Sequence, residues 1–219
     1  GEDMLSADRR KLASMRGKVA AMVFQDPMTA FDPVFTIGHQ IIETIQAHRD
    51  VANAEAKTEA ASLLARVEIK NPTAVLESYP HQLSGGMLQR AMIAMALSCR
   101  PQILFADEPT TALDVTIQAQ ILQLIKNLQV EFGMGLIMVT HDLGVIAETV
   151  DRVVVMYGGR VMEEWPVQQI FDAPSHPYTQ ALLRSIPGQR PGRQRLTEIS
   201  GASPNPVHPP AGCPFHPRC

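Results

Sequence analysis

The chain has 219 residues, 45% of them hydrophobic, so it can bury a sizeable core in one domain with a small satellite. Its formal net charge of -3 argues against a nucleic-acid-binding protein, which would need a broad basic surface. It contains neither an apolar run of about 18 residues nor a signal-like N-terminal segment, so we expect a cytoplasmic protein that does not itself span a membrane.

The first apolar segment, residues 18–24, has the length of a buried strand and is followed by Gln25. An amide directly after a buried strand can meet a ligand or a metal, although an ordinary strand-to-loop exit leaves the same pattern. Residues 33–99 are typical of helices: the apolar positions of residues 37–45 recur at helical spacing, and Asn53 is the expected N-cap of the next helix. They predict a helical insert between two β-rich parts.

Near the end of this helical part, Ser84, Gly85 and Gly86 favour a helix start that binds an anion. Ser84 is a natural N-cap, and the two glycines leave backbone N–H groups uncovered at the positive end of the helix. A phosphate would suit this place. The alternative is a simple turn and cap.

Residues 103–106 are apolar and lead into two adjacent carboxylates, Asp107 and Glu108. This pattern predicts a buried strand that delivers both acids to its carboxyl end, where open α/β sheets place their ligands. Asp114 then caps a predicted amphipathic helix that runs to about Phe132.

A further buried strand, residues 136–140, ends at His141. Strand, helix and strand together are typical of a parallel sheet. His141 either contacts the ligand at the same sheet edge as the two carboxylates or has a structural role, with the next residue capping a helix. Gly158-Gly159 then predicts the turn of a hairpin over residues 152–164.

The tail after Trp165 holds 11 of the 17 prolines. It contains short helical patterns around residues 167–171 and 178–185 and a polar segment at residues 188–195. We interpret it as an appendage whose dispersed arginines form a solvated surface.

Five motifs, in family order, resemble those of the nucleotide-binding subunits of ABC transporters. They are Phe24-Gln25-Asp26-Pro27, Leu83-Ser84-Gly85-Gly86-Met87, residues 103–109, Thr111-Ala112-Leu113-Asp114 and Thr140-His141-Asp142. The resemblance implies an α/β fold of the P-loop NTPase (RecA-like) class, with a parallel-sheet core. It also implies three parts, namely an ATPase core at residues 1–32 and 100–165, an ABC α-helical subdomain at 33–99, and a C-terminal peptide-importer extension at 166–219.

The resemblance assigns roles in ATP hydrolysis to the residues at the strand ends. Gln25 would sense Mg²⁺ and the γ-phosphate, and Asp107 would hold Mg²⁺. Glu108 would orient or deprotonate the attacking water, and His141 would contact the γ-phosphate. These roles fit phosphoryl transfer, which depends mainly on positioning and charge stabilisation around a metal-bound phosphate.

Other roles concern a second ATPase subunit. Ser84, Gly85 and Gly86 would form the signature motif, and Asp114 would belong to the D-loop. In the family two subunits pair head to tail, so that the signature of one completes the site of the other. The resemblance therefore implies a homodimer or a heterodimer.

Residues 24–33, Met87 and residues 175–183 look like those of the oligopeptide/dipeptide (and nickel) importers. The implied function is an ATP-binding and ATP-hydrolysing subunit that energises uptake of peptides, or nickel. Its other partners would be transmembrane permease subunits and, indirectly, an extracytoplasmic solute-binding protein. The subunit would lie on the cytoplasmic face of the inner membrane.

Residues 212–219 look like the start of the subfamily's C-terminal cysteine motif, which in some members holds an iron–sulfur cluster. Cys213 and Cys219 alone cannot complete a four-thiolate site, so a cluster is expected only in a full-length protein. Zinc held by these thiols and His216 or His208 is a further option.

The sequence departs from the family in lacking G-x-x-x-x-G-K-S/T, the loop that cradles the phosphates. We expect an N-terminally truncated fragment without this Walker A region, which binds ATP weakly and does not turn it over. One alternative is a non-catalytic ABC-fold fragment or regulatory domain. Another is the head of an ABC-type DNA-repair or chromosome protein, which the short helices between Gln25 and Ser84 disfavour.

Overall fold

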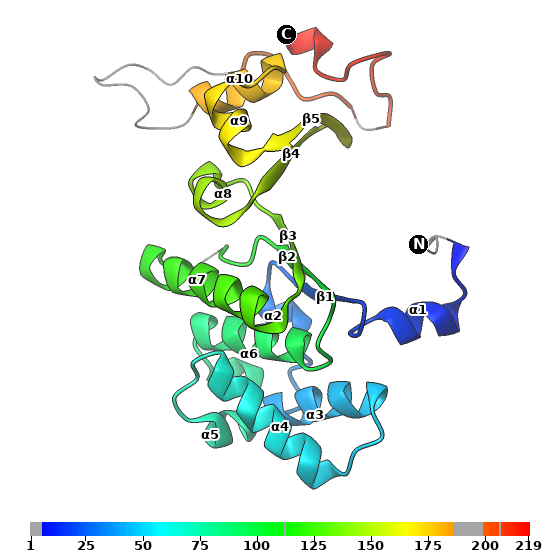
Figure 1. Ribbon diagram of the computed structural model, residues 1–219, viewed down its shortest axis with the longest axis vertical. Coiled ribbons are helices and arrows are strands. Elements are labelled where there is room, and N and C mark those ends of the chain that lie inside the picture. Colours follow the sequence, from blue (N-terminus) through cyan, green and yellow to red (C-terminus); the bar gives the residue numbers. More distant parts are fainter. Residues whose placement is uncertain (1–5, 112, 186–198, 206) are drawn as a thin grey trace. The chain divides into compact units, whose positions relative to one another are not determined.

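The computed structural model describes residues 6–111, 113–185, 199–205 and 207–219, and the chain forms two compact units, residues 1–139 and 140–219 (Figure 1). The elements of the first unit are α1 (Arg9–Met15), β1 (Ala20–Val23), α2 (Pro27–Ala30), α3 (Ile37–His48), α4 (Asn53–Arg66), α5 (Pro72–Leu76), η2 (Pro80–Gln82), α6 (Gly85–Leu97), β2 (Ile103–Asp107), α7 (Val115–Phe132) and β3 (Gly135–Val139). Those of the second are α8 (Leu143–Thr149), β4 (Arg152–Tyr157), β5 (Arg160–Pro166), α9 (Val167–Asp172), α10 (Pro177–Arg184) and η3 (His216–Arg218).

A parallel sheet with the order β1-β2-β3 supports the first unit and confirms the predicted α/β class. Val23 and Leu104 are buried in one core with residues of α6 and α7. The prediction of buried strands holds for only part of the sheet. Val23, Leu104 and Ala106 are buried, but Met22, Phe105 and Ile137 pair side by side in the register and remain exposed, and β3 contains no buried residue. Alternate residues of a strand point to opposite faces, and the helices of this core pack against only one of them.

The helical part of the first unit packs α6 against α3, α4 and β1, as the ribbon in Figure 1 shows. The apolar residues of α3 repeat at helical spacing, and Ile37, Ile41 and Ile45 are fully buried. Asn53 is not the N-cap that the sequence predicts, since it is already the first residue of α4. The cap is Ala52, whose backbone is extended and whose carbonyl accepts from Ala56 N at 3.0 Å.

Arg90 fixes α6 to the elements on both sides of it. Its guanidinium is nearly buried and donates to the Val67 carbonyl at 2.9 Å and to Glu68 Oε2 at 2.8 Å. A third bond, of 3.2 Å, reaches Gln120 on α7. The planar guanidinium can satisfy several acceptors at once, so one side chain joins the end of α4 to α6 and α7.

The antiparallel hairpin of β4 and β5 supports the second unit. Its turn is the predicted Gly158-Gly159 pair, whose φ angles of 55° and 76° are those that a tight two-residue turn needs. Val153 and Val155 pack in a small core with α9. The predicted helical patterns of the tail form α9 and α10, whereas residues 188–195 lie outside the described residues.

Arg218 attaches the C-terminal segment to the hairpin. Its guanidinium donates to the Tyr157 hydroxyl at 2.9 Å and to the carbonyls of Ile199 and Ser200 at 2.6 and 2.9 Å. Phe215 is buried and meets the Tyr157 ring edge-on, with 5.3 Å between the ring centroids. The described part of the tail is therefore packed into the second unit, and this arginine is a structural anchor instead of part of a solvated surface.

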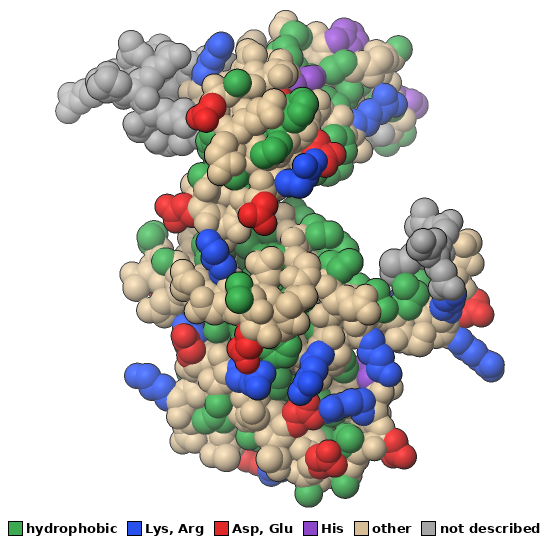
Figure 2. All heavy atoms as spheres, viewed as in Figure 1, with side chains coloured by type: hydrophobic (Ala, Val, Ile, Leu, Met, Phe, Trp, Pro, Cys, Tyr) green, Lys and Arg blue, Asp and Glu red, His purple; other side chains and the backbone are tan. Residues whose placement is uncertain are grey.

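On the face of the molecule shown in Figure 2, Lys and Arg side chains are interspersed with Asp and Glu. Within the part of the chain that the structure describes, no helix has both the length and the apolar character needed to cross a bilayer.

Glu163, a buried residue of β5, holds the start of α10. Its carboxylate accepts the N–H groups of Ser175 at 2.6 Å and of His176 at 3.0 Å. Burial acts to raise the pKa of Glu163, but hydrogen bonding from Thr179 and the two amides lowers it below its usual value. The Thr179 hydroxyl lacks ordinary hydrogen-bond geometry, so we assign the anchoring to the two amides.

Replacing Glu163 with Gln should therefore destabilise the second unit by about 1–3 kcal/mol near neutral pH, because one acceptor oxygen replaces two. Since the folded-state pKa is lowered, this stabilisation exists above the ordinary glutamate pKa and is lost as the pH falls through the folded value. The difference from wild type in chemical denaturation should thus shrink below about pH 4. Glu164→Gln removes only the exposed ion pair with Arg152 and is the control, expected to cost less than about 1 kcal/mol. Equal losses in the two variants would contradict this role.

Candidate functional site

The carboxyl edge of the parallel sheet brings together the polar residues that follow β1 and β2. Val23 pairs with Ala106 in the register, and two positions further along the two strands lie Gln25 and Glu108. Asp107 is the last residue of β2 and is half-buried. The predicted strand-end site is thus located where neighbouring parallel strands end together.

Gln25 and Thr111 both bind the side chain of Glu108. Gln25 Nε2 donates to Glu108 Oε2 at 2.6 Å, and Thr111 Oγ1 donates to the same oxygen at 2.8 Å. Gln25 and Glu108 are 83 positions apart in the chain. Their contact fixes the direction of a carboxylate that stands at the end of a rigid strand.

The backbone at Glu108 adopts an uncommon conformation, with φ of 43°. Such a conformation costs on the order of 1 kcal/mol or more for a residue other than glycine, so surrounding contacts must maintain it. Glu108 N donates to the Val139 carbonyl at 2.8 Å, and Thr111 N donates to the Glu108 carbonyl at 3.1 Å. The carboxylate is therefore presented by a fixed turn.

Two residues that contact this turn, Thr111 and Gln89, had no individual role predicted from the sequence. Thr111 was named only within a motif, yet it binds the carboxylate of Glu108. Gln89 is buried and donates through Nε2 to the Pro109 carbonyl at 2.7 Å. The available signal was a pair of polar residues, Gln89 and Arg90, inside an otherwise apolar helix.

The signature residues begin α6, as predicted. Ser84 is the N-cap and accepts from Met87 N at 3.4 Å, and Gly85 and Gly86 are the first two helical residues. A Cβ atom at Gly86 would lie 3.0 Å from Ile117 Cγ2, so the start of α6 packs closely against the start of α7. That these residues bind phosphate remains a prediction.

Asp114 caps α7, and its side chain accepts from Ile117 N at 3.0 Å, which confirms the predicted cap. Ala112 of the same motif lies outside the described residues.

His141 belongs to the second unit, is exposed and precedes α8. Asp142 caps that helix through bonds to the backbone N–H groups of Gly144 and Val145. The roles of Asp114 in a D-loop and of His141 at a phosphate remain predictions.

Cys213 and Cys219 are exposed thiols in the second unit. Cys213 Sγ lies 3.7 Å from His176 Nε2, and His176 Nδ1 accepts from Tyr178 N at 3.1 Å. With Nδ1 as an acceptor, Nε2 is the ring nitrogen able to carry a proton and donate it to the sulfur. No group of three or more His, Cys, Asp or Glu side chains among the described residues could hold a metal ion, so they do not fit an iron–sulfur cluster.

The donor set at the sheet edge suits Mg²⁺, a hard cation that takes one or two carboxylates and completes its shell with water and phosphate oxygens. Asp107 supplies a carboxylate. Because Gln25 donates through its nitrogen to Glu108, its amide oxygen is the atom suited to the metal. Asp107 and Gln25 would hold the ion, and Glu108 would remain for water.

Two protein families match parts of the chain. "ABC transporter" matches residues 1–111, and "Oligopeptide/dipeptide transporter, C-terminal region" matches residues 162–219. The chain belongs to the ABC transporter ATP-binding family. The first match contains the Gln25, signature and Glu108 segments, and the second contains α10 and the C-terminal cysteines.

Curated relatives of this ABC chain include the dipeptide transport ATP-binding protein DppD of Haemophilus influenzae, 48% identical over 99% of the chain and 66% of the relative. The glutathione import ATP-binding protein GsiA of Escherichia coli O157:H7 is 57% identical over 84% of the chain and 30% of the relative. The chain thus spans about two thirds of the length of the first of these relatives. A dimeric structure of the ATP-binding cassette MJ0796 with ADP and Pi matches with a TM-score of 0.65 and 31% identity, over 74% of the chain and 68% of that structure.

The capping role of Asp114 in this ABC chain predicts different outcomes for two substitutions. Asp114→Ala should lower the free energy of unfolding of the first unit by about 1 kcal/mol, because the N–H of Ile117 loses its acceptor. Asp114→Asn should keep the stability, since asparagine is an equally good cap. Urea denaturation measures both, and identical midpoints for the two variants would rule out the cap as a source of stability.

Proposed function

We propose that the chain is part of the ATP-hydrolysing subunit of an ABC importer that takes up dipeptides or oligopeptides. The observation that carries this proposal is the carboxylate of Glu108, held by Gln25 and Thr111 beside Asp107 at the end of β2. The names of the relatives, dipeptide transport and glutathione import proteins, support a peptide as the solute. Nickel is the alternative solute.

In this proposal ATP and Mg²⁺ bind at the carboxyl edge of the sheet. Asp107 and the amide oxygen of Gln25 would hold Mg²⁺, which would supply charge neutralisation for the phosphates, and Glu108 would orient or deprotonate the attacking water. Gln25 would lie close to both the metal and Glu108, so its side chain would sense Mg²⁺ and the γ-phosphate. His141 would contact the γ-phosphate.

The start of α6 would act on a nucleotide held by a second subunit. Ser84, Gly85 and Gly86 present a capped helix N-terminus, which favours a phosphate through its N–H groups and its dipole. Asp114 would face the same interface. The dimeric cassette MJ0796 with ADP and Pi supports such pairing, and the second subunit is either an identical or a related ATPase.

We propose the following division of the chain into domains. Residues 1–32 and 100–165 would form the nucleotide-binding core, residues 33–99 the helical subdomain, and residues 166–219 the peptide-importer extension. The core includes β1 and β2, which Gln25 and Glu108 follow, and the helical subdomain begins before α3 and ends after α6. The complete subunit would lie against permease subunits on the cytoplasmic face of the membrane and serve an extracytoplasmic binding protein indirectly.

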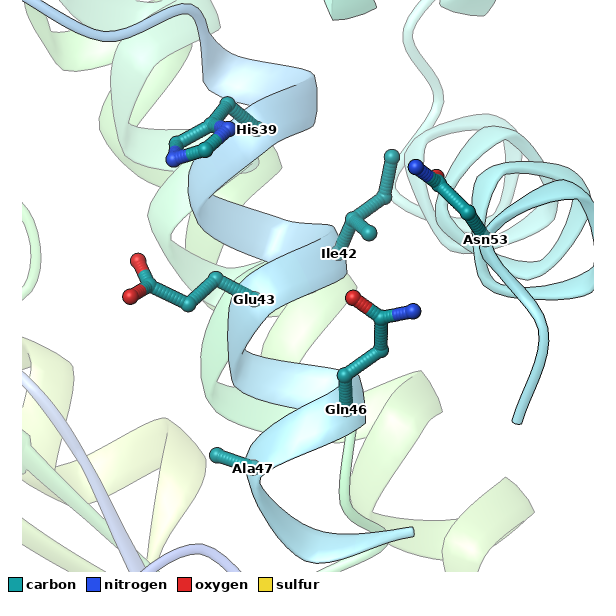
Figure 3. Close-up of a pocket in the computed structure, with 6 residues that line it drawn as sticks. All are labelled: His39, Ile42, Glu43, Gln46, Ala47 and Asn53. Atoms are coloured by element: carbon teal, nitrogen blue, oxygen red, sulfur yellow. The ribbon is translucent and has the colours of Figure 1, made fainter. Parts of the chain in front are cut away.

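The helical subdomain offers a surface for the permease. A pocket on it is lined by His39, Ile42, Glu43, Gln46, Ala47 and Asn53. Figure 3 shows Ile42 and Gln46 on the side of α3 that faces Asn53, with His39 and Glu43 projecting from the other side. The exposed Phe35 ring stacks on His39, with 4.7 Å between ring centroids, and adds apolar area. Exposed apolar groups beside polar ones are typical of a docking surface.

The catalytic assignment predicts the effect of removing one charge. Glu108→Gln in the complete importer should lower ATP turnover by about 10²–10⁴-fold, because an amide cannot act as a base. Initial rates of Mg²⁺-dependent phosphate release measure it.

The 219-residue chain alone, which has no phosphate loop in its sequence, should bind ATP weakly and show no turnover. Turnover by this chain that Glu108→Gln abolishes would contradict the second expectation.

The docking assignment predicts uncoupling when a charge in the pocket is reversed. Glu43→Lys in the complete importer should reduce peptide uptake by about tenfold and leave ATP hydrolysis within about twofold, because the reversed charge meets the permease and not the nucleotide. Glu55→Lys, the same change in the first turn of α4, is the control. Unchanged uptake in Glu43→Lys would remove this surface from the proposed interface.

A further inference from the structure

The side chain of Gln89 connects the helix that starts at the signature residues with the turn that starts at Glu108. It lies on α6, five positions after the N-cap Ser84, and is 2% exposed. Its Nε2 donates to the carbonyl of Pro109, the residue that directly follows Glu108, at 2.7 Å. Twenty positions separate donor and acceptor, so this is a tertiary contact and not a local cap.

The chemistry of Pro109 fixes the orientation of the Gln89 amide. Proline has no N–H group, so its carbonyl is its one main-chain hydrogen-bonding group, and a carbonyl can only accept. The NH₂ end of Gln89 must therefore face Pro109. A side chain of similar size without a donor would leave this buried carbonyl without the bond.

The backbone at Glu108 needs such support. Its φ of 43° is uncommon for glutamate, and a following proline further restricts the residue before it, so the turn is not maintained by local preference. On one side of the turn Glu108 N is bound to the Val139 carbonyl of β3. On the other side the bond from Gln89 holds the next carbonyl.

We propose that Gln89 is a positioning residue for Glu108, which holds the carbonyl of Pro109 and thereby keeps the carboxylate in register with Gln25 and Thr111. The inference rests on the proposed function, in which Glu108 acts on the attacking water. It deepens that function, because Gln89 stands on the same helix as Ser84, Gly85 and Gly86.

The test is Gln89→Met in the complete importer, since methionine keeps the volume and removes the donor. We expect kcat for ATP hydrolysis to fall by about tenfold and KM for ATP to stay within about twofold, because a displaced acid slows chemistry without weakening nucleotide binding. The control is Ser98→Ala. Ser98 is buried at the other end of α6 and donates through Oγ to the Met95 carbonyl at 2.7 Å, so it tests the loss of a buried hydrogen bond remote from Glu108.

Thermal unfolding of both variants separates stability from positioning. A kcat of Gln89→Met within twofold of wild type, or an equal fall in Ser98→Ala, would overturn the proposal. If Gln89→Met does not assemble, Gln89→Asn replaces it under the same criteria, because its amide is one methylene too short to reach Pro109. Glu108→Gln in the same assay separates a failure of the proposed function from a failure of the inference about Gln89. Full turnover in Glu108→Gln would overturn both.

Discussion

The turn that begins at Glu108 is fixed from four directions, and the proposed chemistry depends on it. The Val139 carbonyl holds the amide of Glu108, Gln25 and Thr111 hold its carboxylate, and Gln89 holds the carbonyl of Pro109. Each contact is a single hydrogen bond, worth about 1 kcal/mol net between neutral groups and about 1.5–3 kcal/mol where the acceptor is the carboxylate. Together they maintain a backbone conformation that glutamate followed by proline rarely adopts. A carboxylate placed this way needs little reorganisation when a water and a phosphate arrive.

The parallel register makes this convergence possible. Because Val23 pairs with Ala106 and Asp107 pairs with Val139, the exits of β1, β2 and β3 lie at one edge. The apolar residues of α6 and α7 then hold the sheet from one side, so that the start of α6 comes to lie against the start of α7. The same helix thus carries a signature motif at its start and a support for the acid one turn later.

Much of this could be predicted from the sequence because its signals are local. An apolar run followed by acids, an aspartate before an amphipathic helix and a Gly-Gly pair between two β-rich segments act within a few residues, and they correctly predicted the strand β2, the cap of α7 and the β4-β5 hairpin. The wrong cap at Asn53 was also local, but the chain enters α4 one residue earlier through the extended backbone of Ala52. The contacts of Gln89 and Arg218 could not be predicted, because their partners are brought close only by tertiary packing. The exposure of one sheet face depends likewise on which helices pack against it.

The most direct measurement is a structure of the complete subunit, assembled in its importer, with Mg²⁺ and a non-hydrolysable ATP analogue. We expect Mg²⁺ within about 2.0–2.1 Å of an Asp107 oxygen and a water hydrogen-bonded to Glu108 on the side of the γ-phosphate. Gln25 should then bind the metal through its amide oxygen. A metal bound without Asp107, or a Glu108 carboxylate turned away from the γ-phosphate, would contradict the assignment of metal and water to these two acids.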